Sequence, residues 1–281
     1  MKTTTHSLLL TTGLLFGTAC ARGQAVSPKQ YWITTLIGGD SAVNNIPARH
    51  AWLRGPWRLA VARDGSIYFG ESFAFMIRKV TPDGILVPVA GTGSVGNSGD
   101  GGPALAAELG SDLTGLAVDG SGNVYFADTN FTVRKIGTDG VVNRYAGTGQ
   151  SGFGGDGGPA TSAQLATVNG IALDLLGNLY IATSDNRVRK VTIDGRIDTV
   201  AGTGQASHTG DGGPASQASI DRPSAVAADA DGNLYIAEAS FRIRRVSSDG
   251  VITTVAGNGT YDSAPRVSPP LLKSACSRLS E

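Results

Sequence analysis

The chain has 281 residues, of which 41% are hydrophobic and 16% charged, and 40 are glycine. This composition predicts a turn-rich, all-β globular protein and excludes a disordered chain or a coiled coil. The 23 basic and 23 acidic residues cancel, which removes the electrostatic signature of a protein that binds nucleic acid or anionic membranes.

The first 25 residues differ in kind from the rest. Lys2 opens a short polar start, residues 8–19 are mostly Leu, Thr, Gly and Phe, and small residues follow. This pattern is typical of a secretory signal peptide, and it is too short to span a membrane. We therefore expect an exported protein that is periplasmic, at the cell surface or extracellular.

Several processing sites compete at the end of this signal. Ala19-Cys20-Ala21 and Gly23-Gln24-Ala25 both have the small-x-small pattern of a cleavage site. Residues 17–20 also resemble a bacterial lipobox, although glycine stands where an aliphatic residue is usual. Cys20 is therefore a lipidation candidate, and we expect membrane attachment only in that case. The second cysteine, Cys276, lies in the tail, so no disulfide is expected.

Residues 31–39, YWITTLIGG, have the pattern of residues 250–259, GVITTVAGNG, in which a strand runs into a glycine turn. We interpret them as the last strand of a unit whose first three strands lie elsewhere in the chain. In circular β folds such a strand completes the last unit and removes two exposed sheet edges.

A repeat organises the rest of the chain. Residues 90–104, AGTGSVGNSGDGGPA, return almost unchanged at residues 146–160 and 201–215, and a partial copy begins at Ala256. The spacing of 55 to 56 residues marks a repeat protein, in which neighbouring copies bury each other's apolar faces.

Each copy contains four strand patterns joined by turns. In the clearest copy the strands are residues 113–119, 124–128, 132–136 and 141–145. Four strands joined by hairpins form an antiparallel sheet with two apolar faces, so the copies must stack radially, as propeller blades. A linear β solenoid is the alternative, but it usually needs shorter coils. We expect blades at about residues 57–90, 113–146, 168–201 and 223–256.

Residues 232–257, GNLYIAEASFRIRRVSSDGVITTVAG, resemble an NHL repeat. The longer frame, from AGTG through GDGGPA and GNLYIAD to RVRKV, is similar to the NHL propellers of exported bacterial proteins and of the teneurin family, over residues 31 to about 259. The resemblance implies four-stranded blades, usually six in number. Met76 and Thr132 stand where the family often has the first arginine of RIRK, whereas Arg187 and Arg242 keep it.

The chain supplies four whole blades and one orphan strand. We expect residues 26–259 to form the propeller and residues 260–281 to be an irregular tail, because no further GDGGPA follows Tyr261. A truncated or frame-shifted reading explains the tail, since a shift of one base from Ser263 permits a sequence like residues 153–162. Resequencing the locus tests this hypothesis. A closed four-bladed ring is the alternative, and it leaves the strand at residues 31–39 without its role.

Hairpin topology places six carboxylates on one side of the sheets, which we predict to be the binding face. They are Asp100, Asp156 and Asp211 in the GDGGPA loops, and Glu71, Asp128 and Glu238 at the ends of second strands. A Gly-Asp-Gly-Gly loop offers carboxylate and backbone oxygens that suit Ca²⁺. The alternative is an Asx turn, in which the aspartate accepts backbone N–H bonds and the glycines take positive φ.

The second-strand carboxylates have arginines in register one strand later. These arginines are Arg78, Arg134 and Arg244, and Arg189 takes the same position in the third copy, where Thr183 replaces the acid. Ion pairs within or between blades are one interpretation. A polar ring that lines a ligand pocket is the other.

We find no convergent catalytic set in the sequence. His50 and His208 lie in separate links between blades, which gives little support to a zinc site. No serine has the setting of an activated nucleophile. Trp52, Trp57 and residues 73–75 make the first blade the most aromatic, which suits either sugar or protein binding or packing between blades.

The sequence therefore predicts an exported, non-enzymatic NHL-type β-propeller that presents repeated loops to a protein or glycan partner, without a required cofactor. One alternative is a propeller enzyme, a metal-assisted hydrolase or lyase with its site in the central channel. Such an enzyme needs several unlike polar residues that converge in the channel. A third alternative is a fragment without independent function.

Overall fold

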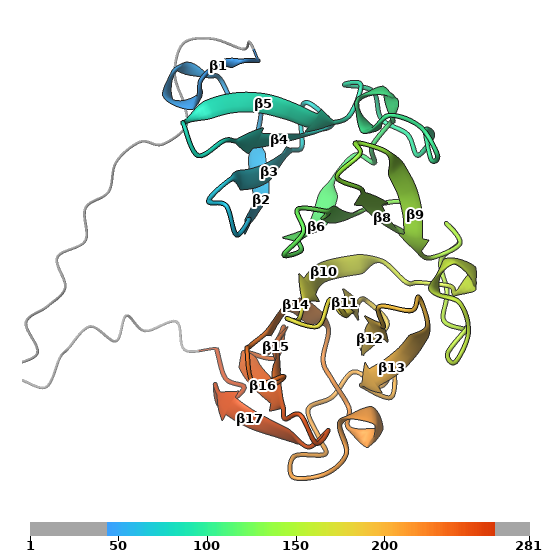
Figure 1. Ribbon diagram of the computed structural model, residues 1–281. Coiled ribbons are helices and arrows are strands. Elements are labelled where there is room, and N and C mark those ends of the chain that lie inside the picture. Colours follow the sequence, from blue (N-terminus) through green and yellow to red (C-terminus); the bar gives the residue numbers. More distant parts are fainter. Residues whose placement is uncertain (1–43, 262–281) are drawn as a thin grey trace, which may run out of the picture. The chain divides into compact units, whose positions relative to one another are not determined.

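The computed structural model describes residues 44–261 (Figure 1). The predicted signal peptide, the lipidation candidate Cys20, the strand predicted at residues 31–39 and the tail from residue 262 lie outside the described residues. Within residues 44–261, no helix is long and apolar enough to cross a membrane.

The described residues form four antiparallel sheets that follow one another along the chain (Figure 1). The first contains β2 (Pro56–Val61), β3 (Ile67–Glu71), β4 (Met76–Val80) and β5 (Ile85–Ala90), with the short β1 (Ile46–Pro47) beyond β5. The second contains β6 (Leu113–Val118), β7 (Val124–Asp128), β8 (Val133–Ile136) and β9 (Val142–Ala146). The third contains β10 (Val168–Leu173), β11 (Leu179–Thr183), β12 (Arg187–Val191) and β13 (Ile197–Ala201). The fourth contains β14 (Pro223–Ala228), β15 (Leu234–Glu238), β16 (Arg242–Val246) and β17 (Ile252–Ala256).

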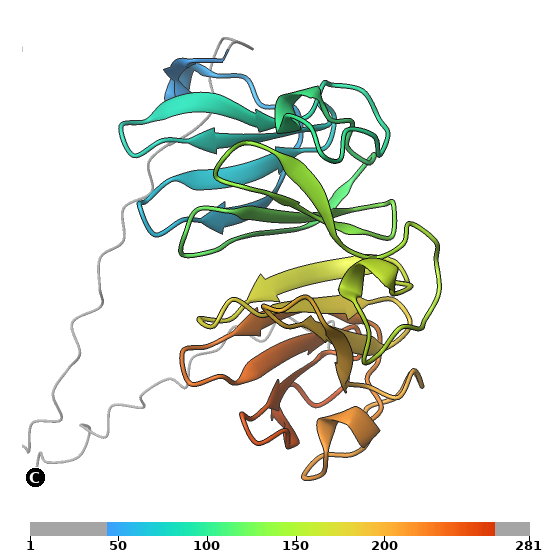
Figure 2. The same ribbon diagram turned by 45° about the vertical axis from the view of Figure 1, so that its right-hand side comes forward.

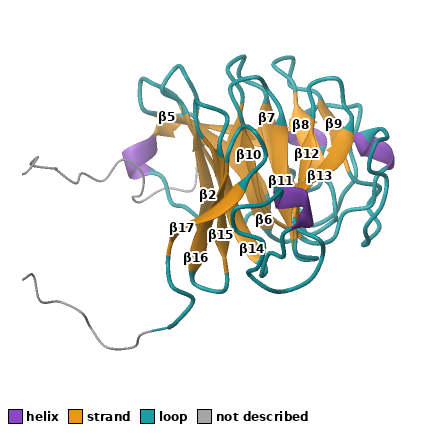
Figure 3. Ribbon diagram, turned by 90° about the horizontal axis from the view of Figure 1, so that it is seen from below, coloured by secondary structure: helices purple, strands orange, loops and turns teal. Residues whose placement is uncertain are grey.

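The predicted all-β fold of four-stranded antiparallel sheets is confirmed, and β1 is an addition to the first sheet. Short 3-10 turns lie in the links that precede the sheets. They are η1 (Ala48–His50), η2 (Ala104–Ala106), η3 (Ala160–Ser162) and η4 (Ala215–Gln217). Figure 3 shows these turns among the loops that border the strands.

Consecutive sheets pack face to face (Figure 2). One buried apolar cluster joins the first sheet to the second, another joins the second to the third, and a further one joins the third to the fourth. The innermost strands of neighbouring sheets, β2, β6, β10 and β14, lie side by side. Each sheet has two apolar faces and packs against the next sheet, with the innermost strands of neighbouring sheets side by side. This is the architecture of propeller blades.

The first and fourth sheets each keep one apolar face that no other described sheet covers. Leu59 on β2 is 63% exposed, whereas its repeat equivalent Leu116 on β6, which packs in the cluster between the first two sheets, is 8% exposed. On the fourth sheet, Ile243 and Val255 are exposed. Residues of the same kind thus lie in different environments at the two ends of the series.

The GDGGPA motif covers the outer edge of the sheet that follows it. The N–H of Gly101 donates to the carbonyl of Val142 on β9 at 2.8 Å, and the N–H of Ala104 donates to the carbonyl of Gly140 at 2.8 Å. The second and third copies make the same bonds. A covered edge does not offer unpaired backbone groups to another chain.

The short strand β1 has the same role for the first sheet. The N–H of Ala48 donates to the carbonyl of Gly84 at 2.8 Å, as the N–H of Ala104 does one repeat later. Pro47-Ala48 is therefore the remnant of a fourth Pro-Ala copy, which the sequence analysis missed because the preceding Gly-Asp-Gly-Gly is absent.

The first glycine of AGTG is required by a close approach of two loops. Gly147 has a φ of +88°, and a Cβ there would clash with the carbonyl oxygen of Phe131 in the β7–β8 turn. Phe131 itself has a φ of +56°, so the turn carbonyl lies against the link. Gly91, Gly202 and Gly257 meet the equivalent carbonyls in the other sheets. The recurrence of AGTG therefore has a structural cause.

Candidate functional site

The aspartates of the GDGGPA loops pair with buried arginines on the third strand of the following sheet. Asp100 lies 2.8 Å from Nε of Arg134, whose guanidinium also donates to the carbonyls of Glu108 at 2.8 Å and Ser98 at 3.0 Å. Each arginine thus binds one carboxylate and two carbonyls of a single link. Such charge-assisted hydrogen bonds are stronger than neutral ones.

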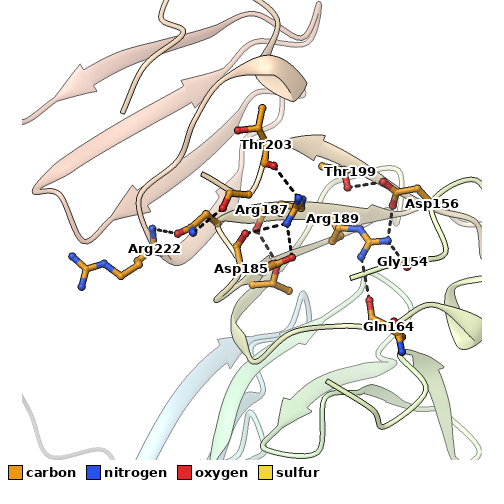
Figure 4. Close-up of polar contacts among 12 residues, drawn as sticks. Gly154, Asp156, Gln164, Asp185, Arg187, Arg189, Thr199, Thr203 and Arg222 are labelled. Carbon is orange, nitrogen blue, oxygen red and sulfur yellow. Dashed lines mark hydrogen bonds and ion pairs between the residues drawn. The ribbon is translucent and has the colours of Figure 1, made fainter. Parts of the chain in front are cut away.

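The same arrangement recurs in the third and fourth sheets. Figure 4 shows Arg189 between Asp156 and the carbonyls of Gly154 and Gln164. In the fourth sheet, Arg244 lies 2.8 Å from Asp211. Burial opposes ionisation of Asp211, but hydrogen bonding to Thr254 and the charge of Arg244 hold its pKa below the usual range overall.

The second-strand carboxylates are buried and bound internally. Glu71 accepts the backbone N–H of Arg54 at 2.8 Å and forms an ion pair with Arg78 at 2.8 Å. Asp128 accepts the backbone N–H groups of Gly110 at 2.9 Å and Asn130 at 3.0 Å. Each carboxylate thus ties the approach to its sheet to the end of the second strand.

Glu238 is bound by two side chains of its own sheet. It accepts the hydroxyl of Ser240 at 2.9 Å and a hydrogen bond from Nη1 of Arg244 at 3.3 Å. Burial nevertheless raises its pKa above the ordinary value, against these two partners. In the third sheet Thr183 instead donates to Asp185, at 2.6 Å.

The six predicted carboxylates are therefore bound by arginines, backbone amides and hydroxyls, and Asp211 and Glu238 share one partner, Arg244. No group of three or more His, Cys, Asp or Glu side chains among residues 44–261 is placed to hold a metal ion. Ligand or Ca²⁺ binding by these six residues stays a prediction.

Exposed aromatic side chains lie on the side of the sheets where links and second-to-third-strand turns meet. The side-chain amide of Asn130, in the β7–β8 turn, donates to the carbonyl of Gly96, in a link, at 3.0 Å. Phe73 and Phe241 are exposed in the equivalent turns of the first and fourth sheets, and Phe153 is exposed in the link before the third sheet. We call this the link side.

The innermost strands bring together four polar residues that the sequence analysis missed. Each strand has one β-bulge, and the bulged residues are repeat equivalents. They are Arg58 on β2, Thr114 on β6, Asn169 on β10 and Ser224 on β14. An alignment of the four repeats could have found them, because the residue at this position differs from copy to copy but is polar in each.

Hydrogen bonds connect these bulges across the sheets. Nη2 of Arg58 donates to the carbonyl of Asn169 at 3.1 Å, and Nδ2 of Asn169 donates to the carbonyl of Pro223 at 2.8 Å. A cavity of about 370 Å³ lies here, lined by Arg58, Thr114 and mainly apolar residues of the four innermost strands. Burial lowers the pKa of the Arg58 guanidinium.

Comparisons with family models and with curated proteins both find similarity to teneurins. A family model described as the teneurin NHL domain matches residues 203–270. Mouse teneurin-3 is 31% identical over an alignment that covers 72% of this chain and 8% of teneurin-3. The chain thus spans less than a tenth of the length of the curated relatives it matches.

Many solved structures share the fold, and two of them illustrate the similarity. One is an auxiliary nutrient binding protein from Bacteroides ovatus, with a TM-score of 0.54 and 21% identity over 73% of this chain and 50% of that one. The other is a protein of unknown function from Bacteroides thetaiotaomicron, with a TM-score of 0.52 and 23% identity over 70% of this chain and 46% of that one.

Proposed function

Because this chain belongs to the NHL-repeat β-propeller family, we propose that it is an exported, non-enzymatic scaffold whose link side binds a protein or glycan partner. The observation that carries the proposal is the presence of exposed aromatic side chains on or beside loops that buried arginines hold in place.

The held loops favour binding because they are already ordered. Arg134, Arg189 and Arg244 are almost completely buried, and each bonds to the link before its sheet. A loop that is fixed before binding loses little conformational entropy when a partner docks.

The aromatic side chains supply contact area on the same side. The guanidinium of Arg187 lies 3.8 Å from the ring centroid of Phe153, so a cation–π contact holds one face of this ring. Phe73 and Phe241 are exposed in the neighbouring turns. Aromatic rings bury large areas at low entropic cost, in protein interfaces and in sugar recognition.

The test compares variants on the link side with a variant on the opposite side of the sheets. The full chain is applied to a carbohydrate microarray, and protein partners are captured by photo-crosslinking from the exporting cells. We expect Phe73→Ala and Phe153→Ala together to weaken retention of the partner by about 10-fold or more, as loss of interface anchors does.

Leu175→Ala is the matched control. Leu175 is exposed in the β10–β11 turn, on the opposite side from the links, and its replacement is expected to leave retention unchanged. If the link-side variants and the control retain the partner equally well, the proposal is contradicted.

A further inference from the structure

The cavity at the innermost strands contains a cation without an anionic partner. Arg58 is the only charged residue among those that line it, and it forms no ion pair with another described residue. A partly buried cation in apolar surroundings loses solvation unless an opposite charge compensates it. The cavity lies in the link-side half of the innermost strands, because Trp57 pairs with Gly70 near the end of β3. A role for this cavity goes beyond the proposed scaffold function and does not rest on it.

The guanidinium keeps most of its hydrogen-bonding capacity. An arginine has five N–H donors, of which Nη2 of Arg58 uses one on the carbonyl of Asn169. Its Nε is buried and has no partner among the described residues, and the same is true of the hydroxyl of Thr114, which also lines the cavity. Two residues that line the cavity, on neighbouring strands, thus each carry a buried polar atom without a partner among the described residues.

The backbone at Arg58 is strained, unlike that of its repeat equivalents. Arg58 has a φ of +49°, whereas Thr114, Asn169 and Ser224 are not among the residues with positive φ. Local preference at such a position favours glycine or asparagine. Strained conformations persist only where the surrounding structure holds them, and they cluster at ligand sites. A large charged residue held there at a cost, beside a cavity, indicates a binding role.

The cavity walls define the rest of the ligand. Leu59, Leu116, Ile171 and Val226 line it, so a ligand contacts apolar side chains on several strands. The volume of about 370 Å³ lies at the small end of the range for small-molecule pockets. A carboxylate matches the planar fork of a guanidinium through two parallel hydrogen bonds.

We propose that this cavity binds a small monocarboxylate with an apolar body, whose carboxylate is held by Arg58 and Thr114. Isothermal titration calorimetry of the full chain with 3-phenylpropionate, and with its neutral amide, tests the charge requirement. We expect the acid to bind at least about 10-fold more tightly than the amide, as a charge-assisted hydrogen bond implies.

Three variants assign the interaction to residues. Arg58→Asn suits the positive φ, so it is expected to fold at least as stably as the natural chain and to lose about 10-fold or more in affinity for 3-phenylpropionate. Arg58→Lys, which keeps the charge without the fork, is expected to lose less. Thr114→Val removes the hydroxyl with little change of shape and is expected to lose about threefold.

The matched control is Arg63→Gln, because Arg63 is an exposed arginine of the β2–β3 turn that does not line this cavity; its affinity should equal that of the natural chain. Equal binding of acid and amide would overturn the proposal. So would undiminished binding by a folded Arg58→Asn or Thr114→Val chain, or the absence of binding at millimolar 3-phenylpropionate.

Discussion

The third and fourth sheets present equivalent residues on the same face, but only one of these faces is covered. Val188 on β12 is fully buried in the cluster shared with the fourth sheet, whereas its equivalent Ile243 on β16 is 42% exposed. The repeat thus encodes a sheet with two apolar faces, and a neighbouring sheet decides which faces are buried. In such arrays stability comes from interfaces as well as from the units themselves.

The largest expected effect comes from the buried arginines of these two sheets. Arg244 pairs with both Asp211 and Glu238, whereas Arg189 pairs with Asp156 alone. Replacing Arg244 by alanine leaves the buried Glu238 unpaired, so we expect Arg244→Ala to lower the free energy of unfolding by about 4 kcal/mol. Arg189→Ala should cost about 3 kcal/mol. Chemical denaturation measures both, and a larger loss for Arg189→Ala would contradict this ranking.

A smaller effect distinguishes the covered face from the uncovered one. Val188→Ala removes two buried methyl groups at the interface between the third and fourth sheets, and we expect a loss of about 2 kcal/mol. Ile243→Ala should cost no more than about 0.5 kcal/mol, as is usual at exposed positions. Thermal unfolding of the two variants provides the comparison. If Ile243→Ala costs as much as Val188→Ala, the face of the fourth sheet is covered in solution.

The smallest effect is the pH dependence of the fourth sheet. Hydrogen bonds from Asn233 are the main reason why the pKa of Asp229 is lowered, and the pKa of Asp211 is lowered as well. Their contribution to stability is present above the ordinary carboxyl pKa and is lost as the pH falls through their folded-state values. We therefore expect the melting temperature to decrease between about pH 5 and pH 3.

Glu238 has the opposite effect on the pH dependence of stability. Burial raises its pKa, so the folded chain binds its proton more readily than the unfolded chain, and this favours folding at low pH. Glu238→Gln removes that opposing contribution. This contribution grows as the pH falls through the raised folded-state pKa toward the ordinary value of 4.5. We therefore expect the melting temperature of the variant to decrease more steeply than that of the natural chain between about pH 6 and pH 4. A shallower decrease would show that the raised pKa does not act in this way.

Much of the fold could be predicted from the sequence because the repeat spacing is regular and the strand and turn patterns within each repeat are local. Four strand patterns per repeat, with turns at fixed positions, lead directly to antiparallel sheets with two apolar faces. Pro47-Ala48 escaped detection because too little of the motif is preserved, although its backbone makes the same edge contact as the later copies.

The sites were less predictable because they depend on non-local geometry. The register of Glu71 with Arg78 could be derived from strand alternation, and the two side chains do form an ion pair. The pairing of Asp100 with Arg134 depends on how the 22-residue link between β5 and β6, residues 91–112, folds back over a strand, which no local pattern encodes. The central position of Arg58 depends on a β-bulge, which changes the direction of a side chain without an obvious sequence signal.

The edge contact made by GDGGPA also decides where one module of this protein ends and the next begins. In sequence the motif follows the outer strand of one sheet, but its hydrogen bonds and its aspartate belong to the next: Asp100 and Arg134 both serve the second sheet. The exchangeable module is therefore a link together with the sheet after it, such as residues 91–146. A chimera joined at that boundary keeps each aspartate with its arginine, whereas one joined at residue 113 combines a link and a sheet of different origin.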